Sequence, residues 1–327
     1  MVLLLSHDDV RSVLSVGDTI TILEQAFAEL EEGVVDIPPS QAFRFDEPKG
    51  IIRVFSACAR RSGFVGLKLS AHYPDNPKAN QLPATRSTIL FNDCRDGTLL
   101  AIMDGTYLTA VRTGATCGVA TKYLARSNSE IAGLLGSGKQ AETQLEAVCC
   151  VRPVRLAKVF SPTASHRTSF SERMSQALGI AVRAADSAED AVIGADIVIT
   201  ATSAKEPVLK GEWLSPGVHV NSIGSGFSDW RELDDDVVRC SKIVVDSMAP
   251  ALNESGDISI PIKKGIIDVC DIHATLSEIV VGKKKARIDE EEITLFKSVG
   301  LAIEDVVTAK FVFERARSLG LGTEVLL

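Results

Sequence analysis

From Glu130 onward, short apolar runs alternate with helix-length segments whose apolar residues recur every three or four positions. The apolar runs are IAGLLG, VRLAKVF, GIAVRAA, ADIVITAT, GVHVNSIG and KIVVDS, and segments such as TSFSERMSQAL and SAEDAVIGA lie between them. Strand-length runs that alternate with helices predict βαβ units and a mostly parallel sheet covered on both faces. Residues 126–304 are therefore predicted to form a doubly wound α/β domain.

The first part of the chain has a different pattern. The segment TILEQAFAEL predicts an amphipathic helix from about Ile20 to Glu31, and it is followed by the strand-like runs GIIRVFSA, GFVGLKLSA, RSTILFN and GTLLAIMDG. Pro, Gly, Asn and Asp separate these runs, which favours an antiparallel sheet. A helix from about Thr109 to Leu124 is expected to link the two halves. The amphipathic C-terminal segment AIEDVVTAKFVFERARSLG is expected to return, so residues 1–125 with 305–327 form an α+β domain.

Composition narrows the class of protein. A chain of 327 residues with 45% hydrophobic residues can build two domains. The net charge of -8 argues against nucleic acid as a partner, and no apolar run reaches the length of a membrane span. The segment MVLLLSHDDV lacks the basic region of a signal peptide. The seven cysteines form no CxxC pair and the five histidines no HxH or HxxxH, so we expect no metal site and a reduced, cytoplasmic protein.

A glycine turn opens the doubly wound part. In IAGLLGSGKQA, the residues Gly136, Gly138 and Ala141 fit the pattern G-x-G-x-x-G/A, directly after a strand and at the start of a helix. The first glycine permits the tight turn, the second lets a pyrophosphate approach the backbone, and the third small residue lets the helix pack on the strand. The helix N-terminus attracts the phosphate charge. In this context the turn predicts a dinucleotide site of the Rossmann type, although such turns also occur as purely structural features.

The end of the following strand bears on the choice of cofactor. An NAD-preferring site usually carries an acidic residue there, but this chain has Phe160-Ser161-Pro162-Thr163 followed by His166 and Arg167. Hydroxyl groups and Arg167 can bind a 2′-phosphate, which favours NADP(H) over NAD(H). The alternative is that Arg167 only lies in solvent at the start of a helix.

Three cations in the first part suggest a site for a carboxylate. They are Arg44 in PPSQAFRFDE, Lys68 in GFVGLKLSAHYP and Arg112 in MDGTYLTAVRTGA. An unpaired ammonium would be costly in the apolar run around Lys68, so an anion is expected nearby, from the protein or from a ligand. The residues after Arg112 are small, which allows a ligand to approach closely. Each cation alone is more often a surface charge or a structural ion pair.

These segments together resemble the ornithine cyclodeaminase/μ-crystallin family over nearly the whole chain. The resemblance rests on GLKLSAHYPDN, LAIMDGTYLTAVRTGA, GLLGSGKQA, GVHVNSIGSGFSDWRELDDD and EEITLFKSVGLAIEDVVTAK. It implies a homodimer, an N-terminal substrate and dimerisation domain completed by the C-terminal helix, and a Rossmann domain that binds NAD(H) or NADP(H).

The resemblance also assigns roles by position. It implies that Arg44, Lys68 and Arg112 bind the substrate carboxylate, with Lys68 and Arg112 as catalytic residues and Val299 as a wall of the substrate pocket. The implied cofactor contacts, taken with those of the glycine turn and the strand end, are Arg112, Gly136, Gly138, Lys139, Gln140, Ser161, Arg167, Thr202, Val220, Asn221, Ser222, Ile223 and Ser298.

One departure from the family pattern bears on the reaction. Ornithine cyclodeaminases and alanine dehydrogenases of this family have an Asp after the strand, in a pattern like IG-x-D-x-PGK-x-EL, where this chain has Gly226. Glycine has no acid–base group, so deamination of a primary amine lacks its expected base. The nearby Asp229 is not shown by sequence to reach the site. The segment DWRELDDD is more similar to the μ-crystallin and ketimine reductase branch.

The resulting hypothesis is NAD(P)H-dependent reduction of a cyclic ketimine carboxylate. The expected substrates are Δ1-pyrroline-2-carboxylate and Δ1-piperideine-2-carboxylate, which give L-proline and L-pipecolate. Reduction of a cyclic imine requires the site to hold the carboxylate, present the imine carbon to the nicotinamide and exclude water. One alternative is an ornithine cyclodeaminase-like lyase or an alanine-type dehydrogenase. Another is a non-enzymatic, NADPH-dependent binder of small ligands. Sequence does not decide the ring size.

Overall fold

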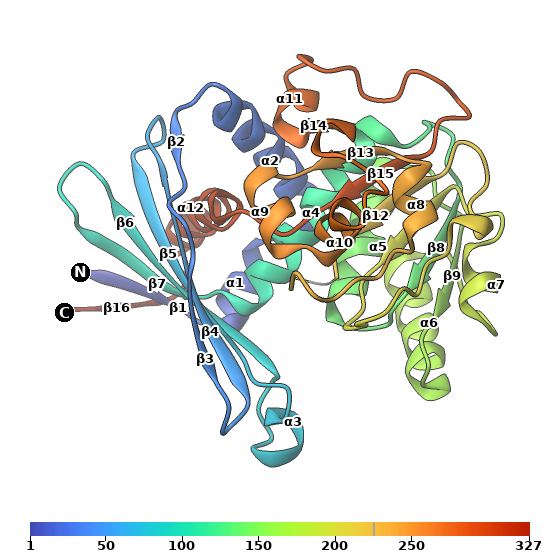
Figure 1. Ribbon diagram of the computed structural model, residues 1–327. Coiled ribbons are helices and arrows are strands. Elements are labelled where there is room, and N and C mark those ends of the chain that lie inside the picture. Colours follow the sequence, from blue (N-terminus) through green and yellow to red (C-terminus); the bar gives the residue numbers. More distant parts are fainter. Residues whose placement is uncertain (225) are drawn as a thin grey trace. The chain divides into compact units, whose positions relative to one another are not determined.

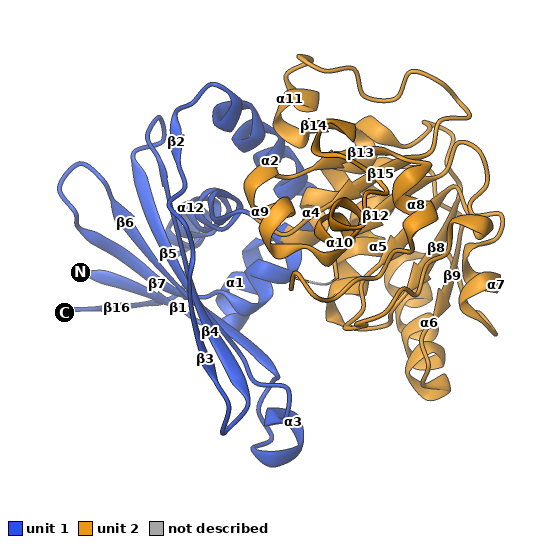
Figure 2. Ribbon diagram, viewed as in Figure 1, with its two compact units in different colours: residues 1–112, 301–327 blue, residues 113–300 orange. Residues whose placement is uncertain are grey.

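The computed structural model describes residues 1–224 and 226–327, and these divide into two compact units. Unit 1 consists of Met1–Arg112 and Leu301–Leu327, and unit 2 of Thr113–Gly300 (Figure 2). Helix α4, Thr106–Leu124, contains the first boundary, because Arg112 is the last residue of unit 1 and Thr113 the first of unit 2. The sequence placed this boundary at the end of the helix and the second one after residue 304. Sequence patterns locate elements, but they do not reveal which half of a continuous helix packs with which sheet.

Unit 1 is built on a sheet with the strand order β16-β1-β7-β6-β5-β4-β2, and β3 pairs with β4 at its side (Figure 1). Neighbouring strands from β2 to β7 pair antiparallel, as the sequence predicts. The strands are β1 (Val2–Leu5), β2 (Val35–Asp36), β3 (Gln41–Phe45), β4 (Gly50–Ala59), β5 (Phe64–His72), β6 (Thr85–Asp93), β7 (Leu99–Asp104) and β16 (Thr323–Val325). The helices that lie wholly in this unit are α1 (His7–Val13), α2 (Val16–Glu31), α3 (Asn76–Ala79) and α12 (Ala302–Leu319).

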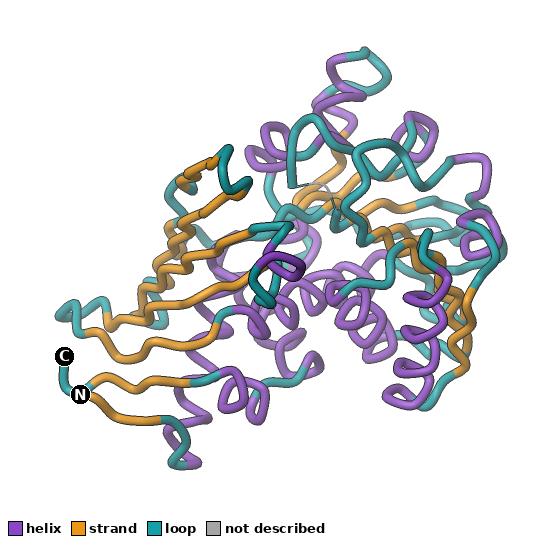
Figure 3. The backbone as a smooth tube through the Cα atoms, turned by 90° about the horizontal axis from the view of Figure 1, so that it is seen from below, coloured by secondary structure: helices purple, strands orange, loops and turns teal. Residues whose placement is uncertain are grey.

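Helix α12 packs along β4 and β5 and against α2, so the C-terminal helix completes the first domain as expected. In Figure 3 the strands of unit 1 form one layer with helices along one side. Gly66 on β5 permits this close packing, because a Cβ atom there would lie 2.7 Å from Cγ2 of Val306. The core between sheet and helices contains Phe27, Ile89, Phe91 and Val312, all of them buried.

The opposite face of the unit 1 sheet carries apolar side chains that are exposed. Leu67 and Leu69 on β5 point away from the helices, since side chains alternate along a strand and the intervening Lys68 is buried on the helix side. Phe43, with 53% of its surface exposed, and Leu90 are also exposed hydrophobic residues of this sheet. Contiguous apolar surface of this kind marks a site of protein association.

Unit 2 is a parallel sheet with the strand order β10-β9-β8-β11-β12-β15-β13-β14. Its strands are β8 (Ile131–Leu135), β9 (Leu156–Phe160), β10 (Ala181–Ala184), β11 (Ile197–Thr200), β12 (His219–Ser222), β13 (Lys242–Val245), β14 (Ile272–Thr275) and β15 (Thr294–Lys297). Its helices after α4 are α5 (Lys139–Val151), α6 (Ala164–Leu178), α7 (Ala188–Val192), α8 (Asp235–Arg239), α9 (Met248–Glu254), α10 (Gly256–Lys263) and α11 (Leu276–Val280), with 3-10 turns at Gly211–Trp213 and Val269–Asp271.

Two hydrophobic cores cover the two faces of this sheet. On β11, Ile197 and Ile199 belong to the core with α5 and α6, whereas Val198 belongs to the core with α8 and α10. A strand that is buried on both faces reads as a continuous apolar run, which is why ADIVITAT could be identified from sequence. The strand order reverses between β8 and β11, and ligands of doubly wound sheets bind outside the carboxyl ends of the strands at such a point. The predicted fold class is confirmed.

Of the helices described, none combines the length and apolar character that a membrane crossing requires. Within the same residues, no group of three or more His, Cys, Asp or Glu side chains is arranged to hold a metal ion.

Candidate functional site

The glycine turn lies between β8 and α5 at the carboxyl end of the sheet. Gly136 has a φ of 114°, and a Cβ atom there would lie 2.3 Å from the carbonyl oxygen of Ala201, so only glycine fits. Gly138 is the N-cap of α5 and brings no side chain that could bind the first N–H groups of the helix. Lys139 and Gln140 begin the helix, and Ala141 is buried against the sheet. The turn therefore fits a pyrophosphate at the N-terminus of α5.

The residues at the end of β9 are those predicted to contact the adenosine ribose. The Ser137 hydroxyl donates to Oγ of Ser161 at 2.8 Å, which links the glycine turn to this strand end. Arg167 on α6 donates from Nη1 to the carbonyl oxygen of Ser161 at 2.9 Å, and its guanidinium lies 5.3 Å from the centre of the Phe160 ring. Arg167 is thus held against the strand end rather than extended into solvent. A cationic group at this position suits a 2′-phosphate.

The residues predicted to line the nicotinamide lie at the carboxyl ends of β11 and β12. Glu232 holds this region, because its carboxylate accepts hydrogen bonds from Thr202 N at 2.6 Å and from Gly224 N at 2.8 Å. It also accepts from the hydroxyls of Thr200 and Thr202 at 2.7 Å. Burial raises the pKa of Glu232 above its usual value, an effect that Lys297 opposes. One side chain therefore fixes the ends of two neighbouring strands.

A second buried acid continues this network. Asp257 accepts from the backbone N–H groups of Glu232 and Leu233 at 2.7 and 2.9 Å, and its Oδ2 lies 2.9 Å from Nζ of Lys297. Ser222 donates to the same oxygen at 3.3 Å. Burial alone would raise the pKa of Asp257, but Lys297 and the backbone donors lower it below its usual value. We refer to Glu232, Asp257 and Lys297 as the unit 2 cluster.

The remaining predicted cofactor contacts are placed as follows. Val220 and Asn221 are fully buried, and the Asn221 amide donates to the Thr121 hydroxyl at 2.8 Å, so their side chains serve the packing of unit 2. Ile223 packs at the edge of one core. Ser298 donates to Asp246 at 3.1 Å, and Asp246 also accepts from the backbone N–H groups of Val299 and Gly300. Burial raises the pKa of Asp246, against the effect of these hydrogen bonds.

In unit 1 the structure brings two of the three predicted cations together. Lys68 on β5 lies with Nζ 2.6 Å from Oδ2 of Asp305, and Arg112 on α4 contacts Oδ1 of the same Asp305 through Nε at 3.0 Å. Nη1 of Arg112 lies 2.6 Å from Oε2 of Glu304. Glu304 and Asp305 both lie in the first turn of α12. These four side chains, all buried, form what we call the unit 1 cluster. The anion expected beside Lys68 is thus supplied by the protein.

Burial controls the ionisation of this cluster. It lowers the pKa of Lys68 from 10.5 to about 8, assisted by the charge of Arg112 and partly offset by Asp305 and Glu304. Burial also acts against the charge of Arg112, but Asp305 and Glu304 outweigh it and raise the pKa of that guanidinium. The four formal charges sum to zero, and the attraction between opposite charges offsets the cost of removing each one from water.

Arg44 lies on β3, opposite Ile51 of β4, and is exposed. Its side chain shares the sheet face of Ile51, and this is also the face of Arg53, Phe55 and Lys68, because Phe55 pairs directly with Lys68. Arg53 is a further cation on this face that was not singled out from the sequence. The signal was present in GIIRVFSA, where a single cation interrupts an apolar strand just as Lys68 does in the next one.

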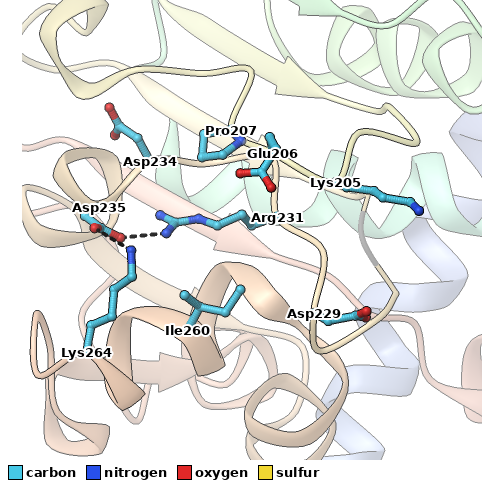
Figure 4. A pocket seen from close by; sticks show the side chains of 9 residues that line it. All are labelled: Lys205, Glu206, Pro207, Asp229, Arg231, Asp234, Asp235, Ile260 and Lys264. Atoms are coloured by element: carbon cyan, nitrogen blue, oxygen red, sulfur yellow. Dashed lines mark hydrogen bonds and ion pairs between the residues drawn. The ribbon is translucent and has the colours of Figure 1, made fainter.

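Asp229 lies elsewhere in unit 2. It lines a polar pocket of about 330 Å³ together with Lys205, Glu206, Pro207, Arg231, Asp234, Asp235, Ile260 and Lys264 (Figure 4). Asp235 pairs with Arg231 at 2.7 Å and with Lys264 at 3.1 Å, and Figure 4 shows Asp229 apart from these pairs. The sequence left open whether Asp229 reaches the site, and the roles assigned to the predicted site residues stay predictions.

Comparison with known proteins identifies relatives along the whole chain. Residues 2–320 match the model of the ornithine cyclodeaminase/mu-crystallin family. Alanine dehydrogenase of Archaeoglobus fulgidus is 37% identical over 326 residues, 99% of this chain and 98% of the relative. Delta(1)-pyrroline-2-carboxylate reductase of Bacillus thuringiensis subsp. konkukian is 34% identical over 324 residues, 99% of each chain.

A solved structure agrees with this result. The complex of Thermococcus litoralis Delta(1)-pyrroline-2-carboxylate reductase with NADH and L-proline is 48% identical to this chain and superposes with a TM-score of 0.96, over 99% of this chain and 100% of that one. The family match spans both units, from β1 through the C-terminal helix α12. The chain therefore belongs to the ornithine cyclodeaminase/mu-crystallin family.

Proposed function

We propose that this protein reduces a cyclic ketimine carboxylate, Δ1-pyrroline-2-carboxylate or Δ1-piperideine-2-carboxylate, to L-proline or L-pipecolate with NAD(P)H. The observation that carries the proposal is the full-length similarity to a reductase of the first of these imines, at 48% identity. The Bacillus reductases and the ketimine reductase mu-crystallin of Macropus fuliginosus, which is 35% identical over 312 residues, support the same reaction class.

The residues of unit 2 fit a nicotinamide dinucleotide. Gly138 in the glycine turn faces open space at the start of α5, as a pyrophosphate requires, and the loops held by Glu232 and Asp246 offer fixed backbone for the nicotinamide. When bound, the reduced cofactor supplies a hydride to the imine carbon. The chain has to orient the two reactants, exclude water and handle one proton.

The residues of unit 1 fit the substrate. Arg44, Lys68 and Arg112 share the task of holding the carboxylate, and Lys68 holds a proton that can pass to the imine nitrogen. An ammonium has three N–H donors, so Lys68 can contact Asp305 and a ligand together. Gly226 offers no base that could take a proton from a primary amine, which favours imine reduction over deamination.

An initial-rate assay with NADH and NADPH tests this function. We expect oxidation of the reduced cofactor that depends on one of the two cyclic imines, with the other as the poorer substrate. Purified protein that binds the cofactor and reduces neither imine would refute the proposal and leave the alanine-type dehydrogenase, the cyclodeaminase or a non-enzymatic binder.

Alanine dehydrogenase activity is the second candidate, because that relative from Archaeoglobus fulgidus is 37% identical over nearly the full chain. It predicts cofactor oxidation with pyruvate and ammonium. The same assay includes this pair and also L-ornithine, whose deamination without added reductant would indicate a cyclodeaminase. A kcat/KM for pyruvate above that for both imines would favour the dehydrogenase.

The cofactor is proposed to be NADP(H) by preference, on the basis of Arg167. Replacing this residue, Arg167→Ala, is expected to raise KM for NADPH about tenfold and to leave KM for NADH nearly unchanged, as loss of one charge-assisted contact requires. Equal KM values for the two cofactors in the unchanged protein would count against the preference. Solved relatives bind NADH and NAD, so NAD(H) is the alternative.

The protein is further proposed to be a homodimer that assembles through the exposed apolar face of the unit 1 sheet. The related archaeal alanine dehydrogenase, 36% identical with a TM-score of 0.94, is a dimer. Leu69→Glu, at the 48% exposed Leu69, is expected to yield monomers in analytical ultracentrifugation. A cytoplasmic location stays a prediction from the cysteine pattern.

A further inference from the structure

Asp305 is the residue of the unit 1 cluster that touches both cations. Its Oδ2 lies 2.6 Å from Nζ of Lys68 and its Oδ1 accepts from Nε of Arg112 at 3.0 Å, whereas Glu304 contacts Arg112. Lys68 is 3% exposed and Asp305 also 3%, so the pair is removed from water. A carboxylate that close to a buried ammonium fixes both its position and its charge.

We propose that Asp305 is a positioning residue that holds the Lys68 ammonium in place and protonated, so that Lys68 serves as the proton donor to the imine nitrogen. This inference rests on the proposed imine reduction and assigns a role to a residue that the sequence did not suggest.

The surroundings of Lys68 make it a suitable donor. Asp305 and Glu304 face it from α12 and Arg112 from α4. From the neighbouring strands it meets uncharged groups, the Phe55 ring on β4 at 4.8 Å and Ile89, its partner in register on β6. Arg53 lies one position further along the same face of β4. The pKa of about 8 keeps Lys68 charged at neutral pH and places it near the range in which proton transfer is efficient.

Lys68 donates the proton in a step that converts the imine to an amine. The lone pair of the imine nitrogen takes a proton from Nζ of Lys68, which becomes a neutral amine. The imine carbon accepts hydrogen with its two electrons from the reduced nicotinamide, and the π electrons of the C=N bond become a lone pair on nitrogen. The product is a secondary amine, and Lys68 regains its proton from water before the next turnover.

The fall of kcat/KM at high pH, the basic limb of its pH profile, measures the loss of this proton from Lys68. We expect a limb near pH 8 in the unchanged protein, since kcat/KM follows the free enzyme, and a fall of about one to two pH units in Asp305→Asn. Glu304→Gln is the matched control, because it removes a neighbouring acid that does not contact Lys68, and its limb is expected to move by less than half as much. The pKa of the free imine also enters the profile, but it is identical for all variants.

Asp305→Glu supplies the rescue, since it restores the charge and is expected to return the limb toward that of the unchanged protein. An unchanged limb in Asp305→Asn, or an equal shift in Glu304→Gln, would overturn the proposal. A general loss of structure would lower kcat/KM at every pH without moving the limb.

A second measurement does not depend on turnover. In protein labelled with ¹⁵N-lysine, the Lys68 signal is assigned by its loss in Lys68→Arg and titrated in the unchanged protein and in Asp305→Asn. A titration midpoint that is lower in Asp305→Asn supports the role of Asp305 even if the imines prove not to be substrates. A midpoint that does not move refutes it whatever the substrate.

Discussion

Each unit buries a cluster of opposite charges, and the two clusters differ in what their carboxylates bind. In the unit 2 cluster, Glu232 and Asp257 accept hydrogen bonds from backbone N–H groups that lie outside the strands, in addition to those from side chains. In the unit 1 cluster, Glu304 and Asp305 accept from the side chain of Arg112, and Asp305 also forms an ion pair with Lys68. A carboxylate that binds backbone fixes the path of the chain, whereas side-chain pairs can rearrange when an anionic ligand arrives. We therefore expect the unit 2 cluster to serve stability and loop geometry, and, under the proposed function, the unit 1 cluster to serve chemistry.

The largest effect is expected from Lys297→Met. Lys297 is fully buried and its Nζ lies 2.9 Å from Asp257, so the substitution leaves a buried carboxylate without its cation. Breaking a buried pair in this way costs about 3–5 kcal/mol in the free energy of unfolding. Denaturant titration of the purified protein at fixed concentration measures this loss.

The matched control is Lys310→Met, at a surface pair in which Lys310 lies 2.8 Å from Glu314 one helical turn away. Its effect is expected to stay below about 1 kcal/mol, as for exposed ion pairs in general. An equal loss in the free energy of unfolding in the two variants would show that the unit 2 cluster stabilises the fold no more than a surface ion pair does, and would contradict the comparison.

Lys68→Met tests the other side of the comparison. It is expected to lower kcat/KM for the imine about a hundredfold, or roughly 2.7 kcal/mol, because the variant can neither hold the carboxylate nor donate a proton. The loss of stability is expected to be smaller than for Lys297→Met, since Asp305 keeps Arg112 as its partner at 3.0 Å. Steady-state kinetics and denaturant titration of the same preparation give both numbers.

Arg60→Met serves as the control for this pair of measurements. Arg60 belongs to an exposed ion pair with Asp36 at 2.6 Å. Its loss is expected to change kcat/KM by less than twofold and the free energy of unfolding by less than about 0.5 kcal/mol. If Lys68→Met lost stability as severely as Lys297→Met and kept its activity, the two clusters would have exchanged the roles assigned to them.

The sequence predicted the frame of the fold because that frame follows from local patterns. Strand runs such as ADIVITAT are buried on both faces and read as continuous apolar segments, and the turn at Gly136 has a fixed chemical requirement. Some strands were not predicted, among them β1 at Val2–Leu5 and β14 at Ile272–Thr275, although β11 at Ile197–Thr200 is just as short.

The site could be predicted only as far as its cations. Lys68 could be identified because it is a charged residue in an apolar strand. An anion was expected beside it because removing an unpaired ammonium from water is costly. Which anion it is depends on a contact between distant parts of the chain: Arg112 and Asp305 are 193 positions apart. Glu304 and Asp305 look like ordinary first-turn acids of a helix, and Glu232 looks like part of the acidic segment DWRELDDD. Local patterns carry no signal for such pairings.

The smallest effect concerns pH and extends the comparison to a neutral buried group. His219, at the start of β12 in unit 2, is fully buried, with Nδ1 2.9 Å from the Thr294 hydroxyl and Nε2 3.2 Å from Oδ1 of Asn221. Burial lowers its pKa from 6.5 to about 3, assisted by the charge of Arg287. Between these values the unfolded chain binds a proton that the folded protein does not, so the stability present above pH 6.5 is lost as the pH falls.

Lys68 acts in the opposite range. Its pKa, lowered from 10.5 to about 8, means that the unfolded chain binds more protons between these values, so its contribution to stability rises with pH there. Acid is thus expected to weaken unit 2 through His219, while the unit 1 cluster responds to alkali.

Denaturant titrations at pH 7 and pH 5 test the acid side: His219→Gln is expected to lose about 2 kcal/mol less in the free energy of unfolding than the unchanged protein between these two pH values. The same loss in both proteins would mean that His219 is protonated in the folded state, and unit 2 would then need a buried counter-charge beside β12 like the one that Lys68 has in unit 1.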